Sequence, residues 1–286
     1  MDQDPPVVHE VLKEIRNELK QIYPPGEIQG ISELIFENLL NYSKTDILLN
    51  SNTKISKLIY NQITEIINQL LKNKPIQYIL GEAWFYDIKL EVSPDVLIPR
   101  QETEELVKWV IEECGSRYLE MVDLGTGSGC IAIALALNLP NAKVYATDIS
   151  ARAVQLAEKN ALVNNADVKF FVDNIFNPLF VKSKKFDIIV SNPPYVTESE
   201  KPRIDKNVLH YEPVTALFVP DQNSLLYYKA IAALAREALT PGGRLYLEIN
   251  ESKSEEIEEL LIRSNFSQIE IRKDINGKFR MVRAVL

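Results

Sequence analysis

Strands and helices are expected to alternate from about Tyr118 to the end of the chain. Short runs rich in β-branched and aromatic residues are separated by helical patterns such as 151–163 and 223–239. This alternation predicts a mostly parallel sheet with helices on both faces. The last two strands leave no room for a helix between them, so Asn276-Gly277 predicts an antiparallel hairpin. The predicted strands are 119–123, 143–147, 168–172, 186–191, 244–249, 267–272 and 279–285.

The N-terminal part has apolar side chains at helical spacing instead. The pattern is clearest over residues 55–71 and weaker over 8–21 and 30–41, which Pro24-Pro25-Gly26 separates. Residues 76–98, which include IQYIL, are rich in β-branched and aromatic residues and predict a hairpin-like β linker. The helical part contains no catalytic cluster, so it is either a structural cap or a domain that recognises a partner. We expect a helical domain over 1–73, a β linker over 74–99 and an α/β domain over 100–286.

Charge and cysteine content narrow the class of protein. The 286 residues carry a net charge of −8, whereas proteins that hold duplex nucleic acid usually show a basic face. Cys114 and Cys130 are too few for a disulfide framework and fit a reducing cytosol. We find no signal peptide and no run that approaches the ~18 apolar residues of a membrane span. We therefore expect a cytoplasmic protein without nucleic-acid or membrane partners. We also expect a monomer, although neither charge nor cysteine content gives the oligomeric state.

A glycine-rich loop follows the first predicted strand of the α/β domain. It reads Asp123-Leu124-Gly125-Thr126-Gly127-Ser128-Gly129 and opens an apolar helix. Glycines let the backbone turn sharply beside a ligand, and the helix start offers free N–H groups. Asp148 ends the second strand, where an acid is placed to accept hydrogen bonds from ribose hydroxyls. Cys130 stands where the dinucleotide fingerprint has its third Gly or Ala, which argues against a nucleotide-dependent dehydrogenase.

The sequence Asn192-Pro193-Pro194-Tyr195 ends the fourth predicted strand. Ligands bind at the carboxyl ends of strands in open α/β sheets, and two prolines stiffen the turn. The Asn192 side-chain oxygen and the Pro193 carbonyl can accept the two hydrogens of an amide NH2 group. Tyr195 can stack on the flat face of that group. A tight turn that only closes the strand is the alternative interpretation, and the preceding glycine loop argues against it.

Several motifs together resemble one family of methyltransferases. Asp123 with its G-x-G-x-G loop is similar to class I S-adenosylmethionine-dependent methyltransferases. Asn-Pro-Pro-Tyr is shared by enzymes that methylate planar nitrogens, such as adenine N6 and glutamine N5. Residues 75–105, YEPVTAL at 211–217 and KTDILL at 44–49 favour glutamine, and the whole chain resembles the release factor glutamine methyltransferase family. Gln101, where many members have proline, and Asn250, where glycine is expected, depart from the family pattern.

The resemblance implies an α/β fold, a seven-stranded class I methyltransferase (Rossmann-like) domain with a small N-terminal helical domain and a β-hairpin linker. It implies S-adenosyl-L-methionine as cofactor and methylation of the glutamine N5 in the GGQ-type motif of class 1 peptide chain release factors, which modulates translation termination. The helical domain would then recognise the substrate.

The resemblance also implies the site residues. A polar residue after the third strand contacts adenine in related enzymes, and Asn174 is our choice, with a turn cap as the alternative. Arg100 and Glu102–Glu104 resemble the family's opening segment near the cofactor, or simply cap a helix. His9 and His210 have no metal-type partners, so we expect no metal. The expected catalytic residues are Asn192, Pro193, Pro194 and Tyr195. The expected cofactor-binding residues are Asp123, Gly125, Thr126, Gly127, Ser128, Gly129, Asp148, Asn174 and Asn192.

Other functions remain open at this point. The same chemistry could act on a glutamine of a ribosomal protein or on adenine N6 of DNA or RNA. A DNA enzyme would be expected to need base flipping and a basic surface, against which the net charge of −8 argues. A non-catalytic cofactor-binding module is a further alternative, and the intact sequence from Asn192 to Tyr195 argues against it.

Overall fold

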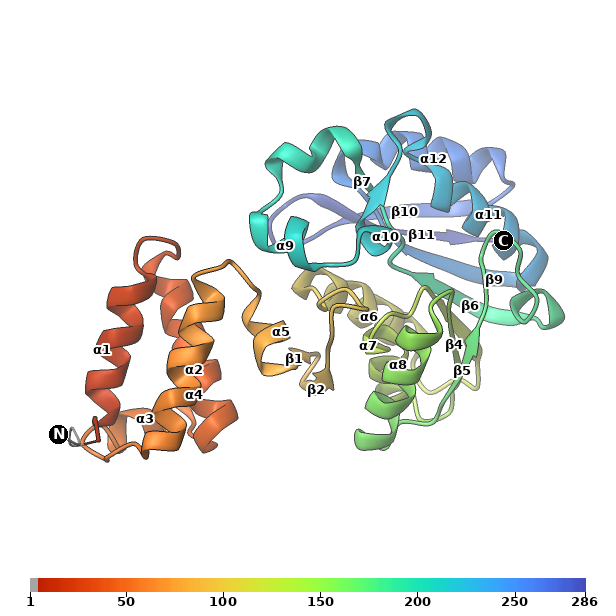
Figure 1. Cartoon of the computed structure of the whole chain (residues 1–286). Helices are drawn as coiled ribbons and strands as arrows, with labels where there is room; N and C mark the ends of the chain where they lie inside the picture. Colours follow the sequence, from red (N-terminus) through yellow and green to blue (C-terminus); the bar gives the residue numbers. More distant parts are fainter. Residues whose placement is uncertain (1–4) are drawn as a thin grey trace. The chain divides into compact units, whose positions relative to one another are not determined.

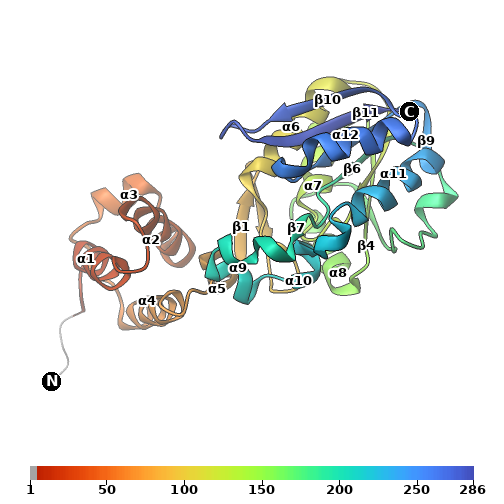
Figure 2. The same cartoon turned by 90° about the horizontal axis from the view of Figure 1, so that it is seen from above.

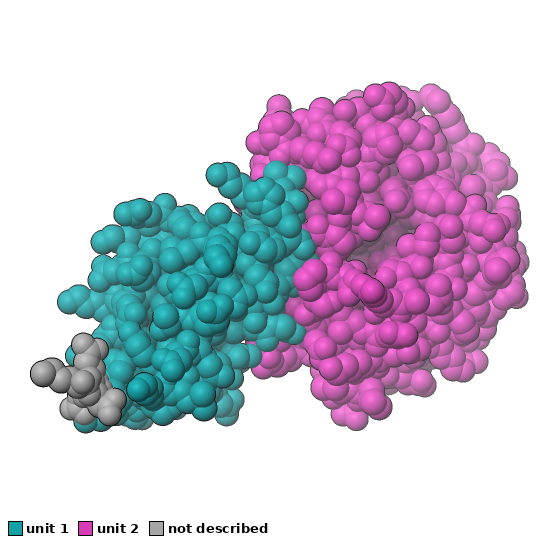
Figure 3. Space-filling view, in the orientation of Figure 1, with its two compact units in different colours: residues 1–81, 206–211 teal, residues 82–205, 212–286 magenta. Residues whose placement is uncertain are grey.

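The computed structural model describes residues 5–286, which divide into two compact units (Figure 3). Unit 1 comprises the chain up to Gly81 together with Lys206–Tyr211, and unit 2 comprises Glu82–Asp205 and Glu212–Leu286. Unit 1 has one hydrophobic core of its own, and unit 2 has one on each face of its sheet.

Unit 1 is the helical bundle that the N-terminal periodicity predicts. In α1, Val8, Val11, Ile15 and Leu19 are buried at spacings of three and four residues, which places them on one face of the helix. The last helix of the unit comes from much later in the chain and is held by the Tyr211 hydroxyl, which donates to the Lys72 carbonyl at 2.9 Å. The helices are α1 (Val8–Leu19), α2 (Pro25–Leu40), α3 (Lys44–Leu49), α4 (Lys57–Leu70), α5 (Ile76–Leu80) and α9 (Lys206–Tyr211).

Two local predictions in this region were wrong. The second helix was expected from residue 30, after Pro24-Pro25-Gly26, but α2 begins at Pro25. Proline suits a first helical position, where its missing N–H would have no partner in any case. Ile76–Leu80 forms the short helix α5 rather than a strand. Pro75 precedes it and Gly81 ends it in the left-handed conformation, so these flanking residues outweigh the β-branched composition.

Unit 2 contains the predicted sheet, with strand order β10-β11-β9-β6-β3-β4-β5. Five neighbouring strands, β5, β4, β3, β6 and β9, pair in parallel, and β11 pairs antiparallel with both β9 and β10. The seven predicted strands and the closing hairpin at Asn276-Gly277 are confirmed. The strands are β3 (Glu120–Leu124), β4 (Lys143–Asp148), β5 (Val168–Val172), β6 (Phe186–Ser191), β9 (Leu239–Glu248), β10 (Ser267–Lys273) and β11 (Phe279–Val285).

Helices cover both faces of this sheet (Figures 1 and 2). Alternate residues of each strand point to opposite faces, so Met121 and Val122 contribute to different cores. On one face lie α6 (Gln101–Cys114), α7 (Cys130–Asn138) and α8 (Ala151–Val163), and on the other lie α11 (Leu226–Ala238) and α12 (Ser254–Arg263). The layered α/β fold expected from the alternating pattern is confirmed.

Short elements complete unit 2. The predicted linker hairpin is present, because β1 (Glu82–Phe85) pairs antiparallel with β2 (Ile88–Glu91). The pair β7 (Val196–Thr197) and β8 (Phe218–Val219) is parallel. The remaining pieces are α10 (Val214–Leu217) and the short 3-10 helices Val181–Ser183, Glu198–Arg203, Asp221–Asn223 and Glu251–Lys253.

Gly129 joins the glycine loop to α7 at a point where two helices approach closely. Its φ is +85°, and an added Cβ would lie 3.0 Å from both Ala157 Cβ on α8 and Ile133 Cδ1 on α7. Gly129 does not line the cavity beside the loop. Its structural role in this chain is to let α7 pack against α8.

We expect Gly129→Ala to lower the free energy of unfolding of unit 2. The left-handed conformation costs alanine ~1–2 kcal/mol, and the overpacked contact adds ~1–3 kcal/mol. Both tryptophans, Trp84 and Trp109, lie in unit 2, so urea unfolding followed by their fluorescence measures this unit.

Gly277→Ala is the matched control, because Gly277 has φ +79° with nothing within 4 Å of an added Cβ. It should show the backbone cost alone. Equal losses for the two variants would mean that the helix contact at Gly129 is not limiting.

Candidate active site

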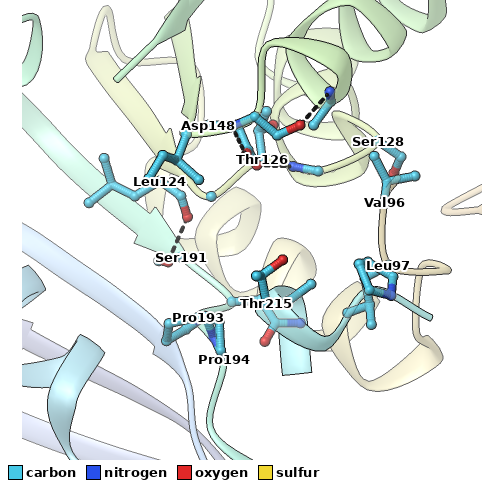
Figure 4. Close-up of a pocket in the computed structure, with 18 of the residues that line it drawn as sticks. Val96, Leu97, Leu124, Thr126, Ser128, Asp148, Ser191, Pro193, Pro194 and Thr215 are labelled. Carbon is cyan, nitrogen blue, oxygen red and sulfur yellow. Dashed lines mark hydrogen bonds between the residues drawn. The ribbon is translucent and has the colours of Figure 1, made fainter. Parts of the chain in front are cut away.

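A cavity of about 260 Å³ opens at the carboxyl edge of the sheet. It lies where β3 has β4 on one side and β6 on the other, the point at which ligands bind in open α/β sheets. The Ser191 hydroxyl donates to the Leu124 carbonyl at 2.7 Å and so links the ends of β6 and β3. Figure 4 shows Asp148 and Thr126 on one side of the cavity, with Pro193, Pro194 and Thr215 across from them.

The glycine loop forms one wall of the cavity through its backbone. The N–H groups of Gly125 and Thr126 donate to the Thr147 carbonyl at 2.8 and 2.9 Å, which fixes the loop against β4. Gly125 and Gly127 have φ of +73° and +55°, a region that side chains disfavour. Gly125, Thr126, Gly127 and Ser128 all line the cavity. The structure therefore brings the predicted loop to the predicted place.

Asp148 lines the cavity at the end of β4, as its position in the sequence indicates. Its Oδ2 accepts the Gly127 N–H and its Oδ1 accepts the Ser150 N–H, both at 2.9 Å. Burial raises the pKa of Asp148, and these backbone donors work in the opposite direction. Each carboxylate oxygen keeps a lone pair that can accept a further hydrogen bond.

Asp123 lies behind the loop and not in the cavity wall. It is fully buried and its Oδ2 accepts the Thr126 hydroxyl at 2.6 Å. Burial, with a smaller contribution from the nearby Asp148, raises its pKa to about 7. Among the described residues, neither Asp123 Oδ1 nor the Ser128 hydroxyl oxygen has a hydrogen-bond partner. Ser128 lines the cavity, whereas Asp123 does not.

The segment after β5 supplies the far end of the cavity. Asp173 is buried and accepts N–H groups from Asn174, Leu179 and Val181, so it organises the turn. Asn174 lines the cavity while its Oδ1 accepts the Phe176 N–H at 2.9 Å. Asn174 thus combines the expected location with the turn-forming role considered as its alternative.

Asn192, Pro193 and Pro194 line the cavity, and Tyr195 does not. The Asn192 amide nitrogen donates to the Thr103 hydroxyl at 3.1 Å. The Tyr195 hydroxyl donates to Glu248 Oε1 at 3.0 Å. The structure therefore places three of these four residues at the cavity and turns the fourth toward a buried carboxylate.

Thr103 and Glu248 belong to this site, although we did not single them out from the sequence. Both are buried, and the Thr103 hydroxyl donates to Glu248 Oε2 at 2.6 Å. Glu248 stands between Leu247 and Ile249 at the carboxyl end of β9. An acid in an apolar strand, at the edge where Asp148 and Asn192 also lie, was the available signal.

A partly buried ion pair joins two segments that line the cavity. Arg100 Nη2 lies 2.6 Å from Glu212 Oε1, and Glu212 Oε2 accepts the Ile98 N–H at 3.4 Å. Residues 95–97 and 99–100 line the cavity from one segment, and Pro213, Thr215 and Ala216 line it from the other. Arg100 occupies the N-cap position of α6 without a side-chain cap hydrogen bond, and its guanidinium binds the YEPVTAL segment instead.

Comparisons with known proteins agree with this geometry. The model of the methyltransferase small domain matches residues 103–211, and that of the PrmC N-terminal domain matches residues 10–81. A release factor glutamine methyltransferase of Flavobacterium psychrophilum is 45% identical over 93% of this chain and 94% of the relative. Another, from Bacteroides thetaiotaomicron, is 44% identical over 94% of this chain and 97% of the relative.

A solved methyltransferase structure from Pyrococcus furiosus shares the fold. It has a TM-score of 0.52 at 21% identity and covers 78% of this chain and 98% of that chain. Together with the sheet order, these matches make the chain a class I methyltransferase. Because relatives of one kind cover almost its whole length at 44–45% identity, the chain belongs to the release factor glutamine methyltransferase family.

No helix within residues 5–286 is both long enough and apolar enough to cross a bilayer.

The raised pKa of Asp123 predicts a stability that depends on pH. The pKa of Asp123 is about 7 in the folded state and near 3.8 in the unfolded state. Its contribution to the free energy of unfolding is therefore lost as pH rises from about 4 through 7, where the unfolded state ionises first. Asparagine keeps an acceptor for Thr126 and does not ionise. Relative to wild type, Asp123→Asn should therefore gain about 2 kcal/mol in free energy of unfolding between pH 5 and pH 8.

Urea unfolding of both proteins at the two pH values measures this difference. Asp167→Asn, at an exposed position, controls for the loss of one charge. A difference that stays constant from pH 5 to pH 8 would contradict the assignment.

Proposed function

We propose that this chain transfers a methyl group from S-adenosyl-L-methionine to the side-chain N5 of a glutamine in peptide chain release factors, within their GGQ-type motif. The observation that carries the proposal is the orientation of Asn192. Its amide nitrogen is engaged with Thr103, so its oxygen remains as an acceptor for a planar NH2 group at the cavity. The names of the relatives support the release factor as the source of that group.

The side chains around the cavity fit S-adenosyl-L-methionine. Asp148 would accept hydrogen bonds from the ribose hydroxyls with its remaining lone pairs. The Ser128 hydroxyl, buried and without a partner among the described residues, would bind the amino-acid end. A buried polar atom of this kind is costly unless a ligand satisfies it.

The other end of the cavity suits a flat aromatic ring. Ile149, Phe176 and Tyr227 line it, and the rings of Phe176 and Tyr227 lie 5.2 Å apart. Asn174 would supply a polar contact at the edge of the adenine. The bound cofactor supplies a methyl group on a positively charged sulfur, which is the electrophile of the reaction.

The role of the protein at the reacting nitrogen is orientation. An amide nitrogen is a weak nucleophile because its lone pair is delocalised. The Asn192 side-chain oxygen and the Pro193 carbonyl would accept its two hydrogens and hold the nitrogen in line for transfer. As the nitrogen becomes more positive, both hydrogen bonds strengthen, so they stabilise the transition state more than the bound substrate.

We infer that unit 1 recognises the protein substrate. Leu48, Leu49 and Leu58 are 71%, 78% and 70% exposed, although leucine is usually buried. Exposed apolar side chains of this kind suit contact with another protein. The unit contributes no residue to the cavity lining, which is consistent with recognition and not chemistry.

Asp148→Ala should weaken the binding of S-adenosyl-L-methionine. A lost charge-assisted hydrogen bond costs ~1.5–3 kcal/mol, or roughly tenfold to a hundredfold in affinity. Calorimetric titration measures the affinity, with exposed Asp167→Ala as the control. Unchanged affinity in Asp148→Ala would remove Asp148 from the cofactor site.

Asn192→Ala should lower the rate of methyl transfer by ~100-fold or more while cofactor affinity changes little, because it removes one of two positioning acceptors. Asn192→Asp should also turn over poorly, because its charge stabilises the sulfonium before reaction. The assay uses labelled methyl groups with a release factor, a ribosomal protein and DNA in parallel. Near wild-type rates for Asn192→Ala, or transfer to another substrate in preference to the release factor, would overturn the proposal.

A further inference from the structure

The Asn192 side chain has two orientations of almost the same shape. One presents the oxygen to the cavity and the other presents the NH2 group, and only the oxygen accepts hydrogen bonds from a substrate amide. A site that methylates an NH2 group therefore needs something to select the first orientation. The cavity-lining residues do not include a charged group bonded to Asn192 that would do this directly.

A buried carboxylate that is linked to Asn192 through the Thr103 hydroxyl selects this orientation. Glu248 is 1% exposed and is not a cavity residue. Burial raises the pKa of Glu248, whereas the Thr103 and Tyr195 hydroxyls and the charge of Arg280 lower it. When Glu248 is ionised, its carboxylate only accepts hydrogen bonds, so the single proton of the Thr103 hydroxyl points to Glu248 Oε2, at 2.6 Å. The Thr103 oxygen then accepts from Asn192, at 3.1 Å, and the Asn192 amide nitrogen must face Thr103.

A second set of contacts, through the Tyr195 hydroxyl, holds Glu248 itself in place. Its other oxygen, Oε1, accepts the Tyr195 hydroxyl at 3.0 Å. Arg280 Nη1 lies 3.5 Å from that same hydroxyl, and Arg280 is held by Asp274 at 3.3 Å. Both carboxylate oxygens therefore receive donors, and a cation lies nearby. Charge-assisted hydrogen bonds of this kind are the strong ones in a buried setting.

We propose that Glu248 is a positioning residue that fixes the Asn192 amide through Thr103, and that it thereby makes the site selective for groups that donate hydrogen, such as an amide, over a carboxylate. The inference rests on the proposed function, since it concerns the same site. Glu248 touches neither the substrate nor the cofactor in this scheme.

Glu248→Gln is the direct test because glutamine has nearly the same shape but carries an NH2 group. When this NH2 group faces Thr103, the Thr103 hydroxyl turns toward Asn192 and the Asn192 amide reverses. Thr103→Val removes the hydroxyl, and Thr103→Ser restores it. Glu258→Gln, at an exposed position on α12, controls for the loss of charge.

We expect kcat to fall about tenfold or more in Glu248→Gln and Thr103→Val, with cofactor affinity near wild type. Thr103→Ser should recover most of the rate. In an Asn192→Ala background, Glu248→Gln should cost little more, because its effect passes through Asn192. A full additional loss in that background would show a general structural role and overturn the inference, as would wild-type kcat in Glu248→Gln.

Inhibition by a release-factor peptide carrying glutamate in place of the glutamine tests the selectivity. Its affinity relative to the glutamine peptide should rise in Glu248→Gln, because an NH2 group then faces the cavity. No change in that ratio would contradict the selectivity. Urea unfolding of every variant checks that the fold is retained.

A measurement without turnover separates this inference from the proposed function. The Asn192 NH2 signals in a 15N-correlated NMR spectrum are identified by their loss in Asn192→Ala. They should exchange with solvent slowly in wild type and faster in Glu248→Gln and Thr103→Val. If wild type fails to methylate a release factor but the NMR result holds, the proposed function fails and the orientation by Glu248 stands. Equal exchange rates in all three proteins would overturn the orientation itself.

Discussion

The in-register parallel pairing of β4, β3, β6 and β9 is the constraint on which the site depends. Leu124 pairs with Thr147 and with Ser191, and Ser191 pairs with Leu247. The residue that follows each of these positions therefore lies at the same level of the carboxyl edge. These residues are Gly125, Asp148, Asn192 and Glu248. Backbone hydrogen bonds thus align the loop, the acid, the amide and the buried carboxylate before any side-chain contact contributes.

This constraint explains why much of the site could be predicted from the sequence. The end of a strand can be identified in a single sequence, because an apolar run stops there and a glycine, an acid or a proline follows. Asp148 and Asn192 were found in this way, and both line the cavity. Asp123 and Gly129 match the same motif, but they lie behind the wall. Spacing identifies the loop, and it does not tell which of its residues face outward.

The connections between side chains could not be predicted in the same way. Thr103 lies 89 residues from Asn192 and 145 residues from Glu248, and no local pattern joins positions that far apart. Asn250 shows the same limit, because it was noted only as a departure from the family pattern. Its buried amide donates to the Tyr195 carbonyl at 3.2 Å and to Glu200 at 3.1 Å, so it anchors the segment after Pro194.

The helix α9 gives the chain a topology that a simple two-domain sequence would lack. The backbone passes from unit 1 to unit 2 after Gly81, returns for Lys206–Tyr211, and leaves again at Glu212. The second and third of these crossings flank α9, which begins 11 residues after Tyr195. The helical unit is therefore encoded by two separate stretches of the gene and not by one. A recombination event that grafted it onto another methyltransferase would have to carry two separated coding segments, the second of them inside the recipient's own catalytic region.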